Sequence, residues 1–126
     1  MKIEHLAIWV QDLEKVKSFY CRYFGAQAGP KYFNVNKNLE SYFLHFNEGC
    51  RIELMRIPQV NERGEKEMLG LAHIALAVGT KELVDSLTAQ LKSDGFRVMG
   101  EPRTTGDGYY ESVILDPEGN RVEITI

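Results

Sequence analysis

Ile3-Glu4-His5-Leu6-Ala7-Ile8-Trp9-Val10 opens the chain, and Leu71-Ala72-His73-Ile74-Ala75-Leu76-Ala77-Val78 repeats its pattern in the second half. Each stretch is a short apolar run with a histidine in third place. The length of these runs, their branched apolar residues and their polar borders are typical of β-strands. Two strands so alike indicate that one structural unit is used twice.

The two halves also end alike. Glu48-Gly49-Cys50-Arg51-Ile52-Glu53 closes the first half and Glu118-Gly119-Asn120-Arg121-Val122-Glu123 closes the second, so both contain the order Glu-Gly-x-Arg-x-Glu. Upstream of these segments, Glu40-Ser41 matches Glu111-Ser112. Similar segments at both ends, in the same order, are less expected by chance than a single match. We therefore expect both halves to fold in the same way.

A helix is predicted after each opening strand. Residues 13–23 lie between a capping Asp12 and a terminating Gly25, and residues 81–93 lie between Thr80 and Gly95. Apolar residues recur on one side of each helix. The predicted buried faces are Val16, Phe19, Tyr20 and Tyr23 in the first helix and Leu83, Val84, Leu87 and Leu91 in the second.

Three further strands are predicted in each half, near residues 31–35, 40–46 and 50–57 and near residues 97–101, 109–115 and 121–126. The unit is thus β-α-β-β-β, used twice in an α+β fold. We expect one domain over residues 1–126, with a first module at about 1–58, a polar linker at about 59–69 and a second module at about 70–126.

Composition excludes several classes of protein. The 126 residues are 44% hydrophobic and 26% charged, with a net charge of −3, which is a normal globular balance without a basic surface for nucleic acid or membranes. No apolar run is long enough to span a bilayer, and the N-terminus does not resemble a signal peptide. Cys21 and Cys50 form no CxxC motif, so we expect reduced thiols and a cytoplasmic protein.

Strand parity brings polar residues of both halves to corresponding faces. Alternate side chains leave opposite faces of a sheet, and the continuous apolar rows should pack under the helices. His5 and Glu53 then lie on the other face in the first half, as do His73 and Glu123 in the second. Two imidazoles and two carboxylates supply nitrogen and oxygen donors, which suit a borderline or hard divalent metal ion.

Two simpler interpretations compete with this metal site. A single inward histidine is more often a hydrogen-bonded core residue than a ligand. Glu53 and Glu123 are also two residues from Arg51 and Arg121, with which they can form surface salt bridges. The full set favours the metal, because carboxylates and imidazoles gathered in a partly buried site need a counter-charge.

Further residues are candidates for contacting a small-molecule substrate. Trp9 and Met55 would flank the metal position on the same face, although core or dimer packing explains them equally well. Arg103 and Tyr110 border a segment with two glycines, which fits either the rim of a pocket or an ordinary surface loop.

With these motifs in view, the chain resembles the vicinal oxygen chelate superfamily over essentially its whole length. Within it, the sequence is similar to glyoxalase I-like proteins, also called lactoylglutathione lyase-like. The segments that carry the resemblance are the His5 strand, Phe19-Tyr20 before Phe24-Gly25, Arg51-Ile52-Glu53-Leu54, Ala72-His73-Ile74-Ala75, and Asp116-Pro117-Glu118-Gly119-Asn120 ahead of Glu123.

The resemblance implies a curved, barrel-like mixed sheet with the helices outside. It implies one Ni, Co or Zn ion held by His5, Glu53, His73 and Glu123, with Glu123 as the catalytic base. It also implies a homodimer and a metal-dependent lyase or isomerase that acts on a small vicinal-dioxygen substrate, such as a thiol adduct of methylglyoxal.

Two departures from the family pattern affect the residues that bind the thiol and leave the metal ligands unchanged. Glutathione-using members usually have an arginine where this chain has Trp9, and an asparagine where it has Ile57. Both departures count against glutathione as the thiol. Two other functions stay open: a sister metalloenzyme, either an epimerase or an extradiol-type dioxygenase using His5, His73 and Glu123, and a metal-free drug-binding resistance protein.

Overall fold

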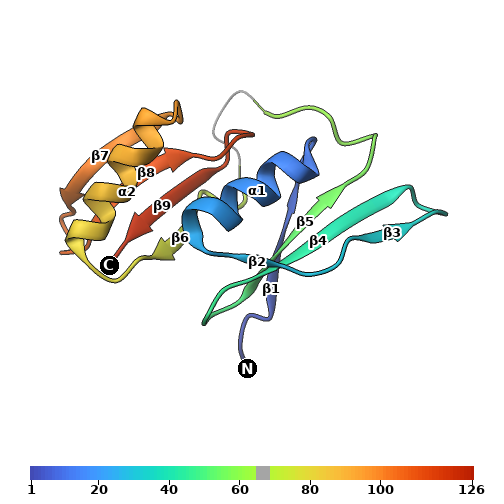
Figure 1. Ribbon diagram of the computed structural model, residues 1–126, viewed down its shortest axis with the longest axis horizontal. Helices are drawn as coiled ribbons and strands as arrows, with labels where there is room; N and C mark the ends of the chain where they lie inside the picture. Colours follow the sequence, from blue (N-terminus) through green and yellow to red (C-terminus); the bar gives the residue numbers. More distant parts are fainter. Residues whose placement is uncertain (65–68) are drawn as a thin grey trace. The chain divides into compact units, whose positions relative to one another are not determined.

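The structure, a computed structural model, describes residues 1–64 and 69–126 (Figure 1). Residues 65–68, which fall within the predicted linker, lie outside the described residues. The chain divides into two compact units, Met1–Arg63 and Gly64–Ile126, each with one helix and one sheet. No helix in the described ranges has the length and apolar character needed to cross a membrane.

The first unit contains a five-stranded sheet in the order β1-β5-β4-β2, with β3 paired to β4. β1 and β5 are parallel, and the other pairings are antiparallel. Its elements are β1 (His5–Trp9), α1 (Leu13–Phe24), β2 (Gln27–Ala28), β3 (Tyr32–Asn34), β4 (Leu39–His45) and β5 (Arg51–Arg56).

The second unit contains a four-stranded sheet in the order β6-β9-β8-β7. Its first and last strands are again parallel, and the others pair antiparallel. Its elements are β6 (Ile74–Ala77), α2 (Lys81–Ser93), β7 (Val98–Thr104), β8 (Tyr110–Leu115) and β9 (Arg121–Thr125). Each unit therefore brings its opening strand beside its closing strand, which places the histidine segment next to the glutamate segment.

The predicted α+β fold with a repeated β-α-β-β-β unit is confirmed, and the first unit adds the two-residue strand β2. The predicted mixed sheet is present as one sheet in each unit, and both sheets contain parallel and antiparallel pairs. Hydrogen bonds among the described residues form two separate sheets, and neither closes into a barrel. Strand patterns identify strands, but they do not identify the edge at which hydrogen bonding stops.

Both predicted helix starts are confirmed. The Asp12 side chain accepts from the Lys15 amide in α1, and Thr80 accepts from the Leu83 amide in α2. In α1 the buried residues include Val16, Phe19 and Tyr20, as predicted.

The buried face of α2 differs from the prediction. Val84, Thr88 and Leu91 are buried, whereas Leu83 is exposed. Burial of Thr88 is possible because its hydroxyl group is hydrogen-bonded, lying 2.6 Å from the Val84 carbonyl oxygen and 2.6 Å from the Ser112 hydroxyl oxygen. A purely apolar pattern assigns a threonine to solvent and therefore missed this orientation of the helix.

Strand pairing also corrects the alignment of the two halves. Ser41 pairs with Met55 in the first sheet, and Glu111 pairs with Thr125 in the second. Ser41 therefore corresponds to Glu111, and the predicted match of Ser41 with Ser112 is one residue out of register. In a strand, a one-residue difference moves a side chain to the other face.

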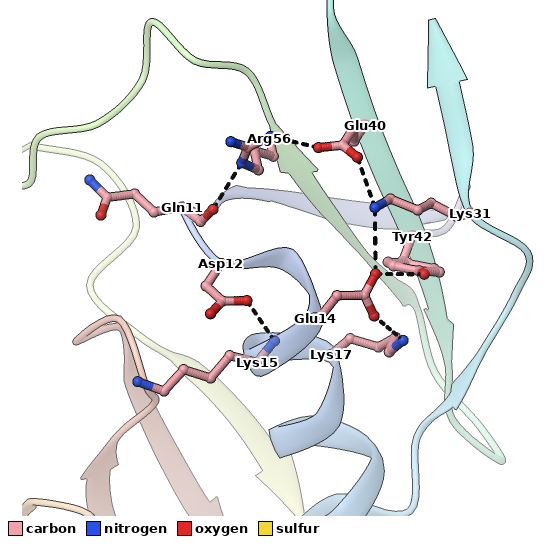
Figure 2. Close-up of polar contacts among 9 residues, drawn as sticks. All are labelled: Gln11, Asp12, Glu14, Lys15, Lys17, Lys31, Glu40, Tyr42 and Arg56. Carbon is pink, nitrogen blue, oxygen red and sulfur yellow. Dashed lines mark hydrogen bonds and ion pairs between the residues drawn. The ribbon is translucent and has the colours of Figure 1, made fainter.

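A network of charged side chains ties α1 to the first sheet (Figure 2). Glu14 on α1 accepts a hydrogen bond from the Tyr42 hydroxyl at 2.9 Å, and Glu40 forms ion pairs with Lys31 at 2.8 Å and Arg56 at 2.6 Å. The hydrogen bond from Lys31, and after it the one from Arg56, hold the pKa of Glu40 below its usual value. Tyr42 pairs with the buried Leu54 and so lies on the helix side of the sheet. The network therefore links α1 to the helix side of the first sheet.

We predict that Gly25→Ala destabilises the protein by about 1 kcal/mol. Gly25 ends α1 with a φ of 65°, a left-handed conformation that costs energy for any residue with a Cβ atom. An added Cβ would meet no atom within 4 Å, so the expected loss is conformational. Urea denaturation measures it. Gly29→Ala is the control, because Gly29 has no positive φ and its Cβ would lie 3.6 Å from the Phe43 carbonyl oxygen, an ordinary contact. Equal losses in the two variants would contradict the prediction.

Candidate functional site

The two glutamates predicted as metal ligands lie on the sheet faces that turn away from the buried core. In β5, Ile52 and Leu54 are buried, and Glu53 between them points to the other face. In β9, Val122 and Ile124 are buried in the same way on either side of Glu123.

In the first unit, His5 and Glu53 approach each other across neighbouring strands. Ala7, two residues after His5, is the register partner of Glu53 in the parallel β1–β5 pair, so the two polar side chains share one face. The Nε2 atom of His5 lies 3.8 Å from the Oε2 atom of Glu53. The Glu53 side chain is 16% exposed, so the pair is partly shielded and still open to a ligand.

In the second unit, His73 and Glu123 repeat this arrangement. His73 directly precedes β6, and Ala75 is the register partner of Glu123. The Nε2 atom of His73 lies 3.4 Å from the Oε2 atom of Glu123, whose side chain is 17% exposed. The two pairs thus have the same donor atoms and matching positions in their strands.

The separations within the pairs suit metal binding. Two donors about 2.1 Å from one ion are about 3.0–3.4 Å apart in octahedral or tetrahedral geometry. The His73–Glu123 separation lies within this range, and the His5–Glu53 separation is slightly longer. Each unit therefore brings together one imidazole and one carboxylate at close to the spacing of two donors on one ion. Within the described ranges, however, no group of three or more His, Cys, Asp or Glu side chains is gathered closely enough to hold a metal ion.

The competing salt-bridge interpretation is not supported for Arg51. Its guanidinium forms an ion pair with Glu4, not with Glu53, and lies 4.1 Å from the centroid of the Phe43 ring. The Nε atom of Arg51 is buried and has no hydrogen-bond partner among the described residues. Glu53 therefore lies beside the His5 imidazole and is not in an ion pair with Arg51.

Trp9 and Met55 lie where strand parity puts them. They are register partners in the β1–β5 pair, two residues along each strand from the Ala7–Glu53 pair and therefore on the same face as Glu53. Trp9 is 45% exposed.

Arg103 and Tyr110 lie in different surroundings. The Arg103 Nη2 atom lies 3.7 Å from the Glu111 Oε1 atom, and Arg103 pairs with Glu111 in the ladder. The Tyr110 hydroxyl donates to Asp85 on α2 at 2.7 Å, and Lys81 on α2 lies over its ring. The structure thus brings Arg103 to the Glu123 side of the sheet and places Tyr110 on the helix side.

Glu111 is a polar residue of this face that sequence reasoning missed. Val113, two residues along β8, is the register partner of Glu123, so Glu111 shares its face. Burial raises the pKa of Glu111, the adjacent Glu123 carboxylate raises it further, and Arg103 partly opposes the rise. Ser41 and Glu111 occupy equivalent places in the two sheets. Aligning these two residues would have placed Glu111 on the same face as Glu123.

We predict that Glu111→Gln stabilises the metal-free protein at pH 7 and that this gain disappears below about pH 4. A carboxyl with a raised pKa in the folded state stabilises that state only when protonated. Its contribution is lost as pH rises from the pKa of the unfolded chain to that of the folded chain. Thermal melts in chelator across this range test the prediction. Glu101→Gln, which removes a charge from an exposed site, is the control. A Glu111→Gln variant that is less stable than the parent protein at pH 7 would contradict it.

Comparison with known proteins adds family evidence to this geometry. The family model described as Glyoxalase/Bleomycin resistance protein/Dioxygenase superfamily matches residues 2–124. The uncharacterized protein YwkD of Bacillus subtilis (strain 168) is 32% identical over 125 residues, covering 97% of this chain and 94% of YwkD.

Solved structures show the same fold. The trypanothione-dependent glyoxalase I of Leishmania major is similar with a TM-score of 0.80 at 22% identity, covering 99% of this chain and 86% of that one. Glyoxalase I from Zea mays is similar with a TM-score of 0.77 at 24% identity. That match covers 98% of this chain and 44% of the maize chain, so this chain spans less than half of the maize protein.

Proposed function

The chain belongs to the glyoxalase/bleomycin resistance protein/dioxygenase superfamily, and from this premise we propose that it is a metal-dependent lyase or isomerase of the glyoxalase I type. Its substrate is a small molecule with two vicinal oxygens. The observation that carries the proposal is the repeated His–Glu pair, with Nε2–Oε2 separations of 3.8 and 3.4 Å at matching places in the two units.

In this proposal, His5, Glu53, His73 and Glu123 together hold one Ni, Co or Zn ion. Each unit contributes one imidazole and one carboxylate. One unit alone therefore supplies only two of the four proposed ligands. The two carboxylates balance the charge of a divalent ion. When bound, the metal polarises the substrate oxygens and leaves positions open for them.

Glu123 is the catalytic base in the proposed reaction. Its carboxylate accepts the proton from the carbon next to the substrate carbonyl and returns it to the adjacent carbon, so the reaction consumes no other reactant. The partly shielded Glu123 side chain suits this role, because water competes less for the proton at such a site. His73 beside it provides a neighbouring donor atom, and Ala75 leaves space above the strand.

Trp9, Met55 and Arg103 are the proposed substrate contacts. Trp9 and Met55 offer an apolar surface on the Glu53 face, and Arg103 offers a positive charge on the Glu123 face. Tyr110 is left out of this set, because its hydroxyl is bonded to Asp85 on the helix side. Trp9 lacks the charge needed to bind a carboxylate of glutathione, so a smaller or less acidic thiol adduct fits better.

The proposal extends to assembly and cell compartment. The two units act as one domain, and two copies of the chain form a homodimer. Cys21 and Cys50 are free thiols in the structure, and the compartment we propose is the cytoplasm, where thiols stay reduced.

Reconstitution tests the function directly. The purified chain is stripped with chelator, reloaded with Ni, Co or Zn, and assayed on methylglyoxal adducts of glutathione and of smaller thiols. We expect metal-dependent conversion of an adduct to a 2-hydroxyacyl thioester, faster for the smaller thiols. Tight binding of a large apolar drug without any metal requirement would instead support a resistance protein, and oxygen uptake with iron would support a dioxygenase.

Mixing two inactive variants tests the assembly. One variant lacks the first pair (His5→Ala with Glu53→Ala), and the other lacks the second pair (His73→Ala with Glu123→Ala). If ligands from two chains complete a site, mixed dimers recover part of the activity. If both pairs must come from one chain, the mixture stays inactive.

A further inference from the structure

Glu4 contacts His5 on the side of the ring opposite to Glu53. The Nδ1 atom of His5 lies 2.5 Å from the Oε2 atom of Glu4, while the Nε2 atom is the one directed at Glu53. We infer that Glu4 is a positioning residue that fixes the His5 ring with Nε2 as its free donor atom.

The hydrogen bond determines which ring nitrogen carries the proton. A carboxylate at neutral pH can only accept hydrogen bonds, so the Nδ1 atom of His5 must be the donor. In a neutral imidazole the other nitrogen then has a free lone pair, which in His5 is Nε2. Glu4 therefore selects the tautomer in which the atom facing Glu53 can bind a metal or accept a proton.

Glu4 is itself held in place by Arg51. The Arg51 guanidinium forms an ion pair with the second carboxylate oxygen of Glu4, and the Arg51 amide donates to the Glu4 carbonyl at 3.1 Å. An isolated surface ion pair would give little orientation. Here the backbone and the side chain of Glu4 are both fixed by one residue of the neighbouring strand.

Phe43 contacts both Arg51 and His5, so the four residues form a closed series of contacts. The Arg51 guanidinium lies over the Phe43 ring at 4.1 Å, and the His5 ring meets Phe43 edge to face, with centroids 5.4 Å apart and an interplanar angle of 88°. Glu4, His5, Phe43 and Arg51 thus contact one another in sequence. Carboxylate partners of this kind orient metal-binding histidines and increase their basicity.

The residues that match Glu4 and Phe43 in the second unit cannot make these contacts. Ala72 occupies the place of Glu4 before His73, and Val113 occupies the place of Phe43 beside Glu123. The two otherwise equivalent histidines should therefore respond differently to loss of Glu4, which makes His73 an internal control.

The first arm of the test uses the metal-free protein. The chain has three histidines, so ¹⁵N spectra of labelled imidazoles can assign His5, His45 and His73 by single substitutions. At about pH 9, above the usual histidine range, we expect His5 to carry its proton on Nδ1 in the parent protein and to shift toward Nε2 in Glu4→Ala. His73 should not change. Glu4→Gln, whose amide oxygen still accepts a hydrogen bond, should keep more of the Nδ1 form than Glu4→Ala.

The second arm measures metal affinity by competition with a chelating dye and Zn or Co, and it rests on the proposed function. We expect Glu4→Ala to weaken binding about 10- to 100-fold. Glu48→Ala, which removes an exposed carboxylate from the same unit, should leave it unchanged. An unchanged His5 tautomer in Glu4→Ala, or a shifted tautomer with unchanged affinity, would overturn the inference. If the parent protein binds no metal, the proposed function fails, and the tautomer alone decides whether Glu4 controls His5.

Discussion

Glu123→Gln is expected to lower the activity of the reconstituted protein by at least about 10²- to 10⁴-fold, the usual contribution of a general acid or base. The amide keeps the shape of the side chain and cannot accept the substrate proton. It also removes a negative charge beside His73, 3.4 Å away, so the bound metal is expected to fall below one per site. Steady-state assays and metal analysis on the same samples measure both effects.

Glu101→Gln is the matched control for this variant. Glu101 is also a glutamate of the second unit, but its side chain is 61% exposed and pairs with Lys92 on the surface. We expect its activity and metal content to equal those of the parent protein. Full activity of Glu123→Gln would contradict both the base and the ligand assignment.

Asp116→Ala is expected to destabilise the protein by about 2–4 kcal/mol. Asp116 is 4% exposed, in the turn between β8 and β9. Its carboxylate accepts hydrogen bonds from the Glu118 amide at 2.9 Å, the Asn120 amide at 2.8 Å and the Asn120 side chain at 2.8 Å. Alanine leaves these donors without that acceptor and loosens the turn that leads into the Glu123 strand. Chemical denaturation of the metal-free protein measures the loss.

Asp107→Ala provides the comparison for this prediction. Asp107 also lies in a turn of the second unit and accepts a hydrogen bond from Thr105, but it is exposed. We expect its effect to stay within about 0.5 kcal/mol, as for most surface substitutions. Losses of similar size in the two variants would show that the buried hydrogen bonds of Asp116 contribute little.

Much of the fold could be predicted from local signals in the sequence. Asp12 and Thr80 mark both helix starts because capping depends on a few neighbouring residues. The repeated opening and closing segments identified the β-α-β-β-β unit. The extent of each sheet was not predictable in the same way, since it depends on which strand edges pair over long distances.

The candidate site could be predicted only where strand parity was sufficient. Parity assigned the four proposed ligands and Trp9 to their faces, because those strands alternate regularly. Glu111 was missed because the two halves were aligned one residue apart, and Tyr110, which was chosen from its glycine-containing segment, lies on the helix side of its sheet. Glu4 was missed for another reason: its role follows from a side-chain contact with His5 that no periodicity reveals.

Metal stoichiometry shows whether two equivalent His–Glu pairs share one metal ion. Protein reloaded with Zn or Co is freed of excess metal and analysed by mass spectrometry, alongside variants that lack either pair. We expect one ion for each set of two pairs in the parent protein and loss of that ion when either pair is removed. An ion retained by one pair without the other, or no bound ion in the parent protein, would contradict it.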